Sequence, residues 1–286
     1  MKLAIACASG SFKGAFTHGV LTAFESAGIR ADAYASSSSS VIPSAYAAIG
    51  KATELGVNYW LIGMQELQKP NMGMSQVVMG GIKFFNPPLD ELLAAETPDY
   101  FVAVNAVVNL EAASQTQGEK SRRLGRRLLV SAAKKDRSWV DENLQLELFS
   151  NRKNNFIKSS KIDENNFDEI AYASSRMLHA WDIPAWINEK PYIDASYTCL
   201  CPAIEMIEAG YKQVIAISNE PGTFYRDMFG LEIIPENYQG VDIHIIKPDT
   251  DLKEMGVDFT NATPEGLLAV YKHGQEKGRE FLANWE

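Results

Sequence analysis

The sequence has few of the residues that most often hold metal ions or cross-link chains. These are three cysteines and four histidines, namely Cys7, Cys199, Cys201, His18, His179, His244 and His273. An odd number of cysteines cannot form a complete set of disulfides, and the spacing of these three suits no zinc site. None of the histidines lies in a recognisable motif. We therefore expect reduced thiols and a cytoplasmic protein, with no metal ion and no organic cofactor.

Long apolar runs are also absent. No uninterrupted apolar segment reaches the roughly 20 residues that a transmembrane helix needs, so any contact with a membrane would be peripheral. The apolar start at residues 3–7 is too short for the hydrophobic region of a signal peptide and soon breaks into Ser9-Gly10-Ser11. We interpret this start as a buried strand and expect no cleavable signal peptide.

Basic residues are outnumbered by acidic ones. The chain has 27 Lys and Arg against 36 Asp and Glu, which gives a formal net charge of -9. Nucleic-acid binding depends on a basic surface that meets the phosphates. We therefore expect no nucleic-acid partner. The main exception to the acidic balance is a basic segment at about residues 118–155, which we expect to be an insertion.

What the sequence does contain is enough apolar material for a sizeable core. Its 286 residues are 46% hydrophobic and 22% charged, as in one large α/β domain spanning residues 1–286. Residues 3–7 predict a strand covered on both faces, followed by a loop and a helix that ends at Gly28. A second strand is predicted at residues 31–35. The helix after it begins near Val41 and is expected to continue past Gly50.

Further elements are indicated downstream of these two units. Apolar runs predict strands at residues 100–108, 213–217 and 241–246. Thr263 followed by Pro264 indicates the capped start of a last helix. Strands alternating with helices favour a mostly parallel sheet, and successive units of this kind place their loops at the same carboxyl edge.

Five consecutive serines, residues 36–40, follow the second predicted strand. A strand, a sharp turn of small residues and then a helix is the context of a nucleophile elbow, in which a serine hydroxyl is exposed at the edge of the sheet. A flexible linker is also rich in serine. Linkers, however, are not normally flanked by apolar residues on both sides, and Pro43 suits the start of a helix. We interpret the serine run as an elbow.

The loop at residues 8–14 joins the first predicted strand to its helix. Backbone amides of such a loop can bind an anion, either a phosphate or the oxyanion of an ester under attack. Because its only glycines are Gly10 and Gly14, the loop matches neither the dinucleotide pattern nor the P-loop pattern. Nucleotide binding is therefore a weak alternative, and a tight turn without any ligand is another.

In order and spacing, these segments resemble the motifs of the patatin-like phospholipase family. That family carries GGGx(R/K)G, then GxSxG, then a distant DG(G/A). This chain has SGSFKG at residues 9–14, SSSSS at residues 36–40 and Asp194-Ala195-Ser196, with Ala173-Ser174-Ser175 and Pro184 before the third motif. The resemblance covers most of the chain. It implies a three-layer α/β/α sandwich with a mostly parallel central sheet.

The resemblance also implies roles for individual residues. Ser38 would be the nucleophile and Asp194 its base. The oxyanion hole would come from the amides of Gly10, Ser11 and Phe12, with Lys13 nearby. Such a Ser/Asp pair needs no histidine. The implied activity is hydrolysis of lipid esters, with phospholipids or lysophospholipids as the expected substrates.

The chain departs from the family at glycine. Positions 9, 11, 36, 40, 195 and 196 hold serine or alanine where the family usually has glycine, and each change costs about 1 kcal/mol if the family backbone is kept. These changes motivate an alternative from another class, a catalytically impaired patatin-like protein that binds lipid or a partner. Ser38, Asp194 and His244 also follow the chain order of an α/β-hydrolase triad, which stays a second mechanistic alternative. We expect His18, on the first helix, to be a packing residue.

Two segments between the motifs carry open alternatives. The basic segment predicts an amphipathic helix that either contacts anionic lipid headgroups or is a solvated helix whose leucines cover the core. Its candidate headgroup ligands are Arg122, Arg123, Arg126 and Arg127, and its apolar face is Leu124, Leu128, Leu129 and Ala132. Flexible methionines either line an acyl-chain pocket or fill the core. They are Met64, Met72, Met74 and Met79.

Overall fold

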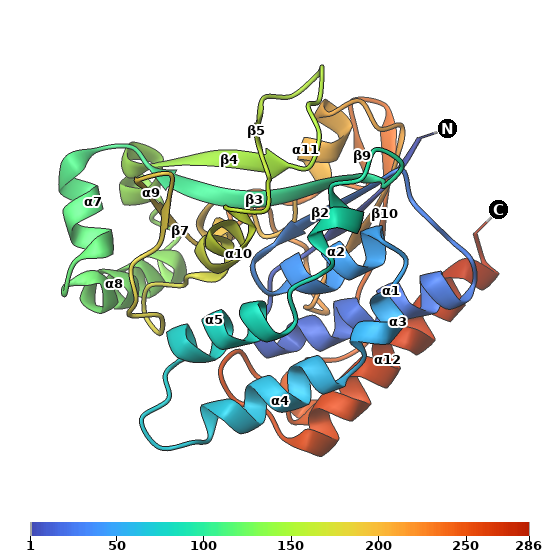
Figure 1. The fold of residues 1–286 in the computed structure, drawn as a ribbon, viewed down its shortest axis with the longest axis horizontal. Helices are drawn as coiled ribbons and strands as arrows, with labels where there is room; N and C mark the ends of the chain where they lie inside the picture. Colours follow the sequence, from blue (N-terminus) through green and yellow to red (C-terminus); the bar gives the residue numbers. More distant parts are fainter. Residues whose placement is uncertain (1, 286) are drawn as a thin grey trace.

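A mixed sheet runs through the centre of the computed structural model, which describes residues 2–285 (Figure 1). The strand order is β5-β4-β3-β2-β1-β8-β10-β9, and β7 joins β6 to β3. The strands are β1 (Leu3–Cys7), β2 (Ala33–Ser37), β3 (Asp99–Val107), β4 (Leu144–Ser150), β5 (Ser159–Lys161), β6 (Trp186–Ile187), β7 (Lys190–Ile193), β8 (Gln213–Ile217), β9 (Asn237–Tyr238) and β10 (Val241–Ile246).

The middle of the sheet is parallel. Strands β3, β2, β1, β8 and β10 each run parallel to their neighbours in this row, whereas β4 and β7 are antiparallel to β3, and β9 is antiparallel to β10. Ala6 of β1 pairs with Ala35 on one side and Ala216 on the other. Side chains of β1 alternate between the two faces, so that Ile5 belongs to one core cluster and Ala6 to another. The whole strand is therefore apolar.

Helices flank both faces of the sheet. The helices are α1 (Gly14–Ser26), α2 (Val41–Ala48), α3 (Ala52–Leu55), α4 (Asn58–Leu67), α5 (Met74–Phe84), α6 (Leu89–Leu92), α7 (Leu110–Gln117), α8 (Ser121–Ala133), α9 (Ser138–Asn143), α10 (Phe167–Ser175), α11 (Ala203–Glu208) and α12 (Pro264–Ala283). Short 3-10 turns are η1 (Ser11–Lys13), η2 (Ser38–Ser40), η3 (Ala195–Tyr197) and η4 (Leu252–Met255).

The helices fall into two layers and an end group. Helices α1, α2, α10 and α12 contribute to the larger core cluster on one face, while α11 packs on the other face. Helices α7, α8 and α9 lie together at one end of the sheet (Figure 1). The fold is a three-layer α/β/α sandwich with a mostly parallel central sheet, as the sequence predicts.

Helices α1 and α12 pack at close range because glycine lines their contact. A Cβ atom on Gly19 would lie 2.1 Å from the carbonyl oxygen of Tyr271, and one on Gly274 would lie 2.1 Å from that of Phe16. Only a residue without a side chain allows the two backbones to approach this closely. This pair fixes α1, whose N-terminal end carries the first loop.

Some predicted boundaries are wrong. The second strand is Ala33–Ser37, two residues later than predicted. The helix that begins at Val41 ends at Ala48, because Gly50 has φ 71° and turns the chain, so the predicted continuation past Gly50 does not occur. The last helix does begin after Thr263, whose side chain accepts a hydrogen bond from the Gly266 amide. Within residues 2–285, no helix combines the length and apolar character that crossing a bilayer requires.

Candidate active site

The two predicted loops meet at the carboxyl edge of β1 and β2. These strands are parallel and in register, with Cys7 opposite Ser36, so the chain leaves both at the same edge. Ser38 is the first residue after β2 and has φ 57°, a left-handed conformation that is uncommon for residues other than glycine. Its amide donates a hydrogen bond to Ser174 Oγ of α10 at 2.8 Å. The backbone at Ser38 thus has the sharp turn expected of an elbow.

The structure brings Ser38 and Asp194 together from 156 positions apart in the chain. Ser38 Oγ donates a hydrogen bond to Asp194 Oδ2 at 2.9 Å. The Ser38 side chain is 8% exposed and that of Asp194 is 1% exposed. A hydroxyl in contact with a buried carboxylate is the geometry that a serine nucleophile and a general base require.

Asp194 is fixed by its backbone as well as its side chain. It follows β7, and its amide donates to the carbonyl of Arg176 at 3.1 Å. Its own carbonyl accepts from Asn105 Nδ2 at 2.7 Å. The second carboxylate oxygen, Oδ1, accepts from the Ser196 amide at 2.7 Å. Only Oδ2 is therefore directed to Ser38.

Burial changes the acidity of Asp194. Removal from water disfavours the charged carboxylate and raises the pKa of Asp194 to about 6, although the hydrogen bonds from Ser196 and Ser38 act in the opposite direction. A carboxyl group with a pKa in this range is ionised at neutral pH yet accepts a proton readily. These are the properties of a general base.

The first loop brings backbone amides close to Ser38. Ser11 and Ser38 line the same two cavities, and Gly10 lines one of them. Among residues 2–285, the amides of Gly10 and Ser11 donate to no other protein group, whereas the Lys13 amide donates to the Gly10 carbonyl at 3.0 Å. The Phe12 amide faces the carbonyl of Phe259 at 3.5 Å. Of the four predicted oxyanion-hole residues, Gly10 and Ser11 thus have unoccupied amides.

Asn219 holds the first loop in place. Its Nδ2 donates to the carbonyls of Ala8 and Ser9, each at 3.0 Å, and its Oδ1 accepts from Thr17 Oγ1 at 2.8 Å. A Cβ atom on Gly10 would lie 2.9 Å from Asn219 Nδ2. Glycine is therefore needed at position 10 for this contact, whatever its backbone angles.

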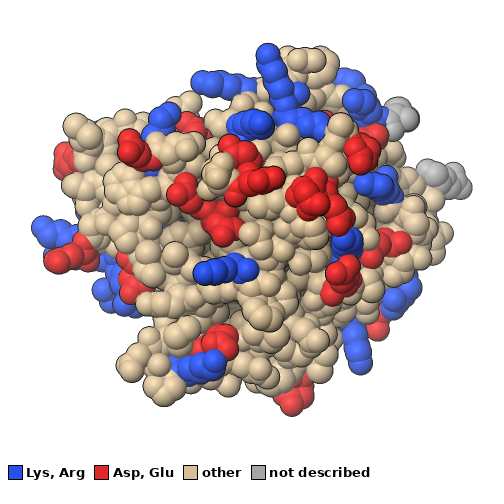
Figure 2. All heavy atoms as spheres, in the orientation of Figure 1, with Lys and Arg blue, Asp and Glu red and all other residues tan. Residues whose placement is uncertain are grey.

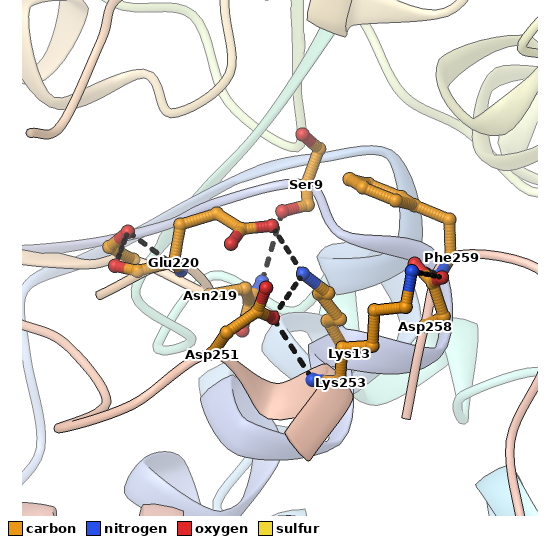
Figure 3. Close-up of polar contacts among 9 residues, drawn as sticks. Ser9, Lys13, Asn219, Glu220, Asp251, Lys253, Asp258 and Phe259 are labelled. Atoms are coloured by element: carbon orange, nitrogen blue, oxygen red, sulfur yellow. Dashed lines mark hydrogen bonds and ion pairs between the residues drawn. The ribbon is translucent and has the colours of Figure 1, made fainter. Parts of the chain in front are cut away.

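Lys13 forms ion pairs with two carboxylates beside the first loop (Figure 3). Its side chain is 4% exposed, and its ammonium group contacts Glu220 at 2.8 Å and Asp251 at 3.0 Å. The same ammonium group lies 5.1 Å from the centre of the Phe259 ring. Contact with the two carboxylates raises the pKa of Lys13, despite the opposing effect of burial. Lys13 therefore joins the first loop to the segments around Glu220, Asp251 and Phe259.

Most of the glycine replacements cause no backbone strain. Of the six replaced positions, only Ser11 has a positive φ, at 49°. Ser36 and Ser40 use their hydroxyls, which donate to the carbonyls of Phe101 and Ala8 respectively. The Ser40 bond connects the turn at residues 38–40 directly to the first loop. The expected strain is thus confined to one residue of the loop.

Two cavities meet at Ser38. The first, of about 490 Å³, lies between α4 and α5, and we call it the α5 cavity. Its lining is mainly apolar and includes Tyr59, Trp60, Met72, Met74, Val77 and Phe84. Two of the four predicted methionines thus line a cavity, while Met64 belongs to the core and Met79 is exposed. Gly80 and Gly81 of α5 also border this cavity.

The second cavity, of about 540 Å³, lies on the other side of Ser38, and we call it the α8 cavity. It contains Asp194 and is bordered by Leu129 and Ala132 of α8 and by Met228 and Phe259. Trp181 lines both cavities. An ester at Ser38 would therefore have apolar space on either side.

His18 and His244 lie away from Ser38, whereas His179 lines the α8 cavity. His244 borders a separate cavity with Lys277 and Trp285, and its ring packs against Phe281 and Trp285, so the structure does not support the triad alternative. His18 is buried, with Nε2 contacting the Ala52 carbonyl at 2.8 Å and Nδ1 accepting from Trp60 at 3.1 Å. Burial lowers the pKa of His18 to about 4. The expectation that His18 is a packing residue is confirmed.

Three residues that position the site were not identified from the sequence. Asn105 is a buried polar residue inside the otherwise apolar run of β3, a signal that could have revealed it, whereas Asn219 follows β8 among other polar residues and carries no such signal. Arg176 is fully buried, and its guanidinium group donates to Thr116 O at 2.8 Å and to Gln117 Oε1 at 3.3 Å. Nothing in the sequence around Arg176 indicates this role.

Comparisons with known proteins give no family, and the likeness to a solved structure described here is weak. No protein-family model matches the chain, and no curated protein matches it. Among solved structures, the chain is similar to the crystal structure of VipD from Legionella pneumophila, with a TM-score of 0.45 and 11% sequence identity. The match covers 99% of this chain and 66% of the VipD chain. This chain therefore spans just under two thirds of the length of that neighbour.

Proposed function

We propose that this protein is a serine acyl hydrolase that cleaves carboxylic esters of lipids, with phospholipids or lysophospholipids as substrates. The observation that carries the proposal is the 2.9 Å hydrogen bond from Ser38 Oγ to the buried carboxylate of Asp194. The order of the three motifs and the elbow at Ser38 further support membership of the patatin-like phospholipases.

The proposed reaction has two stages. Ser38 Oγ attacks the ester carbonyl carbon while Asp194 takes the hydroxyl proton, and the amides of Gly10 and Ser11 stabilise the oxyanion. The carbon–oxygen bond to the alcohol breaks as Asp194 returns the proton to the leaving oxygen. Asp194 then takes a proton from water as that water attacks the acyl group on Ser38. The bond between the acyl carbon and Ser38 Oγ breaks, Asp194 returns the proton to Oγ, and the fatty acid is released. No metal ion or organic cofactor takes part.

The cavities suggest how the substrate lies. The α5 cavity, with its mainly apolar lining, would accept the acyl chain. The α8 cavity, which also contains Asn219, Glu220 and Ser196, would accept the alcohol part of the ester. The scissile carbonyl would then lie at Ser38, where the two cavities meet.

Labelling with a fluorophosphonate probe tests the nucleophile. We expect the wild-type protein to take up one probe at Ser38 and to hydrolyse p-nitrophenyl esters, and Ser38→Ala to lose both. Ser39→Ala is the matched control, since Ser39 neighbours Ser38 and lines the α5 cavity. It should keep the labelling. The mechanism is wrong if folded wild-type protein hydrolyses esters while Ser38 takes up no probe.

The same assay decides between the hydrolase and a catalytically impaired lipid-binding protein. Such a binding protein would turn over no ester, and Ser38→Ala would behave like the wild type. The strained conformation of Ser11, at φ 49°, is the observation that favours this second candidate, because it lies in the proposed oxyanion hole. A loss of measurable esterase activity in Ser38→Ala eliminates it.

A further inference from the structure

Helix α8 carries a concentration of unpaired positive charge. Residues 119–136 contain seven Lys and Arg but only two acidic residues, in a chain whose net charge is -9. The seven cations are Lys120, Arg122, Arg123, Arg126, Arg127, Lys134 and Lys135, and all are exposed. In the part of the chain from residue 2 to residue 285, none of them forms an ion pair, whereas nearby Arg137 pairs with Asp141 and Asp227. These charges have no partner in the fold.

The inner side of α8 is firmly attached to the rest of the molecule. Leu124 and Leu128 are buried in a core cluster. A Cβ atom on Gly125 would lie 2.3 Å from the backbone nitrogen of His179. The backbone of α8 is therefore in direct contact with the backbone of the segment around His179. The outer side, which bears the arginines, is therefore held in a fixed orientation. Figure 2 shows Lys and Arg side chains projecting at the edge of the molecule where Figure 1 places α7 and α8.

Helix α8 also borders the candidate active site. Leu129 and Ala132 line the α8 cavity, which contains Ser38 and Asp194. The next residue after Leu129, Val130, is 55% exposed, and Leu129 itself is 38% exposed. Leu129 thus borders the cavity and is also partly exposed, while Val130 is exposed among the arginines. A soluble partner would gain little from this combination of groups, whereas a lipid surface offers anionic headgroups to the cations and acyl chains to the apolar side chains.

We propose that α8 docks the protein on a bilayer that contains anionic lipids. The arginines bind headgroups, Leu129 and Val130 enter the interface, and the α8 cavity opens toward the membrane. A lipid leaving the bilayer would then reach Ser38 through this cavity; this last step rests on the proposed hydrolase function. The docking itself does not.

Co-sedimentation with vesicles tests the docking. The probes are vesicles of phosphatidylcholine alone and of phosphatidylcholine with about 30% phosphatidylserine. We expect the wild type to bind the anionic vesicles and to bind the neutral ones far more weakly. Charge reversal at Arg122, Arg123, Arg126 and Arg127 to Glu should weaken binding to anionic vesicles about tenfold or more, since each cation near the surface contributes separately.

A matched control removes the effect of net charge. Lys153, Lys158, Lys161 and Lys212 are exposed and belong to other parts of the surface, and their reversal to Glu changes the net charge by the same amount. This control should bind anionic vesicles as the wild type does to within about twofold. Equal losses in both variants, or none in the α8 variant, overturn the docking proposal. Binding of duplex DNA would also overturn the proposal if, at the same salt concentration, it were stronger than vesicle binding and were lost in the α8 variant.

A fluorescent label tests the orientation. The three native cysteines are buried, so Val130→Cys offers a single site for an environment-sensitive fluorophore. Leu268→Cys, on α12, is the control, because Leu268 is 39% exposed on a helix that packs against α1. We expect a blue shift at position 130 and none at 268 when anionic vesicles are added. An unchanged spectrum at position 130, or the same shift at both positions, overturns the orientation.

Hydrolysis of a water-soluble ester separates the two proposals. The four arginines take no part in the proposed chemistry, so the α8 variant should hydrolyse p-nitrophenyl butyrate at the wild-type rate. If the wild type hydrolyses no ester but its vesicle binding depends on α8, the hydrolase fails and the docking stands. If it hydrolyses the soluble ester but its vesicle binding is independent of α8, the docking fails and the hydrolase stands.

Discussion

The acidity of Asp194 gives the first prediction at the scale of single residues. Burial raises the pKa of Asp194 to about 6, and only the ionised carboxylate can take the proton of Ser38. We therefore expect kcat/KM for a soluble ester to rise with pH and to reach half its maximum near pH 6. The measurement is a pH–rate profile of the wild type on p-nitrophenyl butyrate. A profile that is flat from about pH 5 to about pH 8 contradicts a base with this pKa.

The same pKa has a consequence for stability. Because burial raises the pKa of Asp194 in the folded state above the ordinary value of an aspartate, the ionised carboxylate weakens the folded state, and stability is lost as pH rises through about 6. Asp194→Asn removes this penalty while keeping an oxygen that can accept from the Ser196 amide. We expect the variant to be inactive, and more stable than the wild type by about 3 kcal/mol at about pH 8 but not at about pH 3.

Urea unfolding of both proteins at the two pH values measures this difference. A variant that loses activity but gains stability only at high pH indicates a residue kept for chemistry rather than for folding. Equal stability of the two proteins at high pH would show that Asp194 is not penalised by burial.

Ser11 provides a prediction about the strained loop. Its φ of 49° costs an L-residue about 1 kcal/mol, which glycine avoids. Ser11→Gly should therefore leave stability unchanged or raise it by up to about 1 kcal/mol, despite the extra freedom of glycine in the unfolded chain. Ser9→Gly is the control, since Ser9 has no positive φ, and it should lower stability by about 0.5–1 kcal/mol. Thermal unfolding gives both values, and the opposite ranking contradicts the strain.

Prediction from the sequence was most successful for residues that lie within a motif. Ser38 and Asp194, far apart in the chain, were both predicted and are in contact. The contacts of Lys13 were not predictable, because Glu220 and Asp251 belong to distant loops whose positions depend on the whole fold. Arg176 was missed for a different reason: its partners are mostly backbone carbonyls, which carry no sequence signal.

At the scale of elements, helix α5 gives a prediction about substrate length. Gly81 borders the α5 cavity, and a Cβ atom there would have no neighbour within 4 Å. Gly81→Leu would add a side chain to this open space without displacing the backbone. We expect kcat/KM for p-nitrophenyl palmitate to fall about tenfold or more. The value of kcat/KM for p-nitrophenyl butyrate should stay within about twofold, because only the long acyl chain needs the part of the α5 cavity that the leucine would fill.

Gly222→Leu is the control for this experiment. Gly222 also has no neighbour within 4 Å of a Cβ atom, but it borders a different cavity. This variant should treat both esters as the wild type does. If Gly81→Leu slows both esters equally, the α5 cavity does not hold the acyl chain.

Elements with a clear apolar pattern were well predicted, and those that depend on tertiary contacts were not. Strands β8 and β10 occupy the predicted residues, because β8 is mostly an apolar run and β10 begins with alternating apolar and polar residues. The basic segment does contain a helix, but its apolar residues divide into two groups. Leu124 and Leu128 are buried, whereas Leu129 and Ala132 border the α8 cavity. Helical spacing alone could not separate core from cavity.

At the scale of the whole molecule, charge is unevenly distributed. An acidic chain would be repelled by an anionic bilayer. The cations in and around α8, however, are gathered at one end of the molecule. In the proposed docking, such a distribution would turn the molecule so that one surface meets the membrane. Because Leu129 and Ala132 of the same helix line the α8 cavity, the proposed docking would couple the orientation of the molecule to access to Ser38.

This coupling predicts different salt dependences for two substrates. Screening between exposed charges is strong at high ionic strength, where the Debye length falls from about 10 Å at 0.1 M to about 3 Å at 1 M. We expect hydrolysis of phospholipid in anionic vesicles to fall about tenfold or more over this range, in parallel with vesicle binding. Hydrolysis of soluble p-nitrophenyl butyrate should change less than about twofold, since no surface charge is needed for a monomeric ester to reach Ser38. Equal salt dependence of the two rates would mean that charge acts at the chemical step and not in docking.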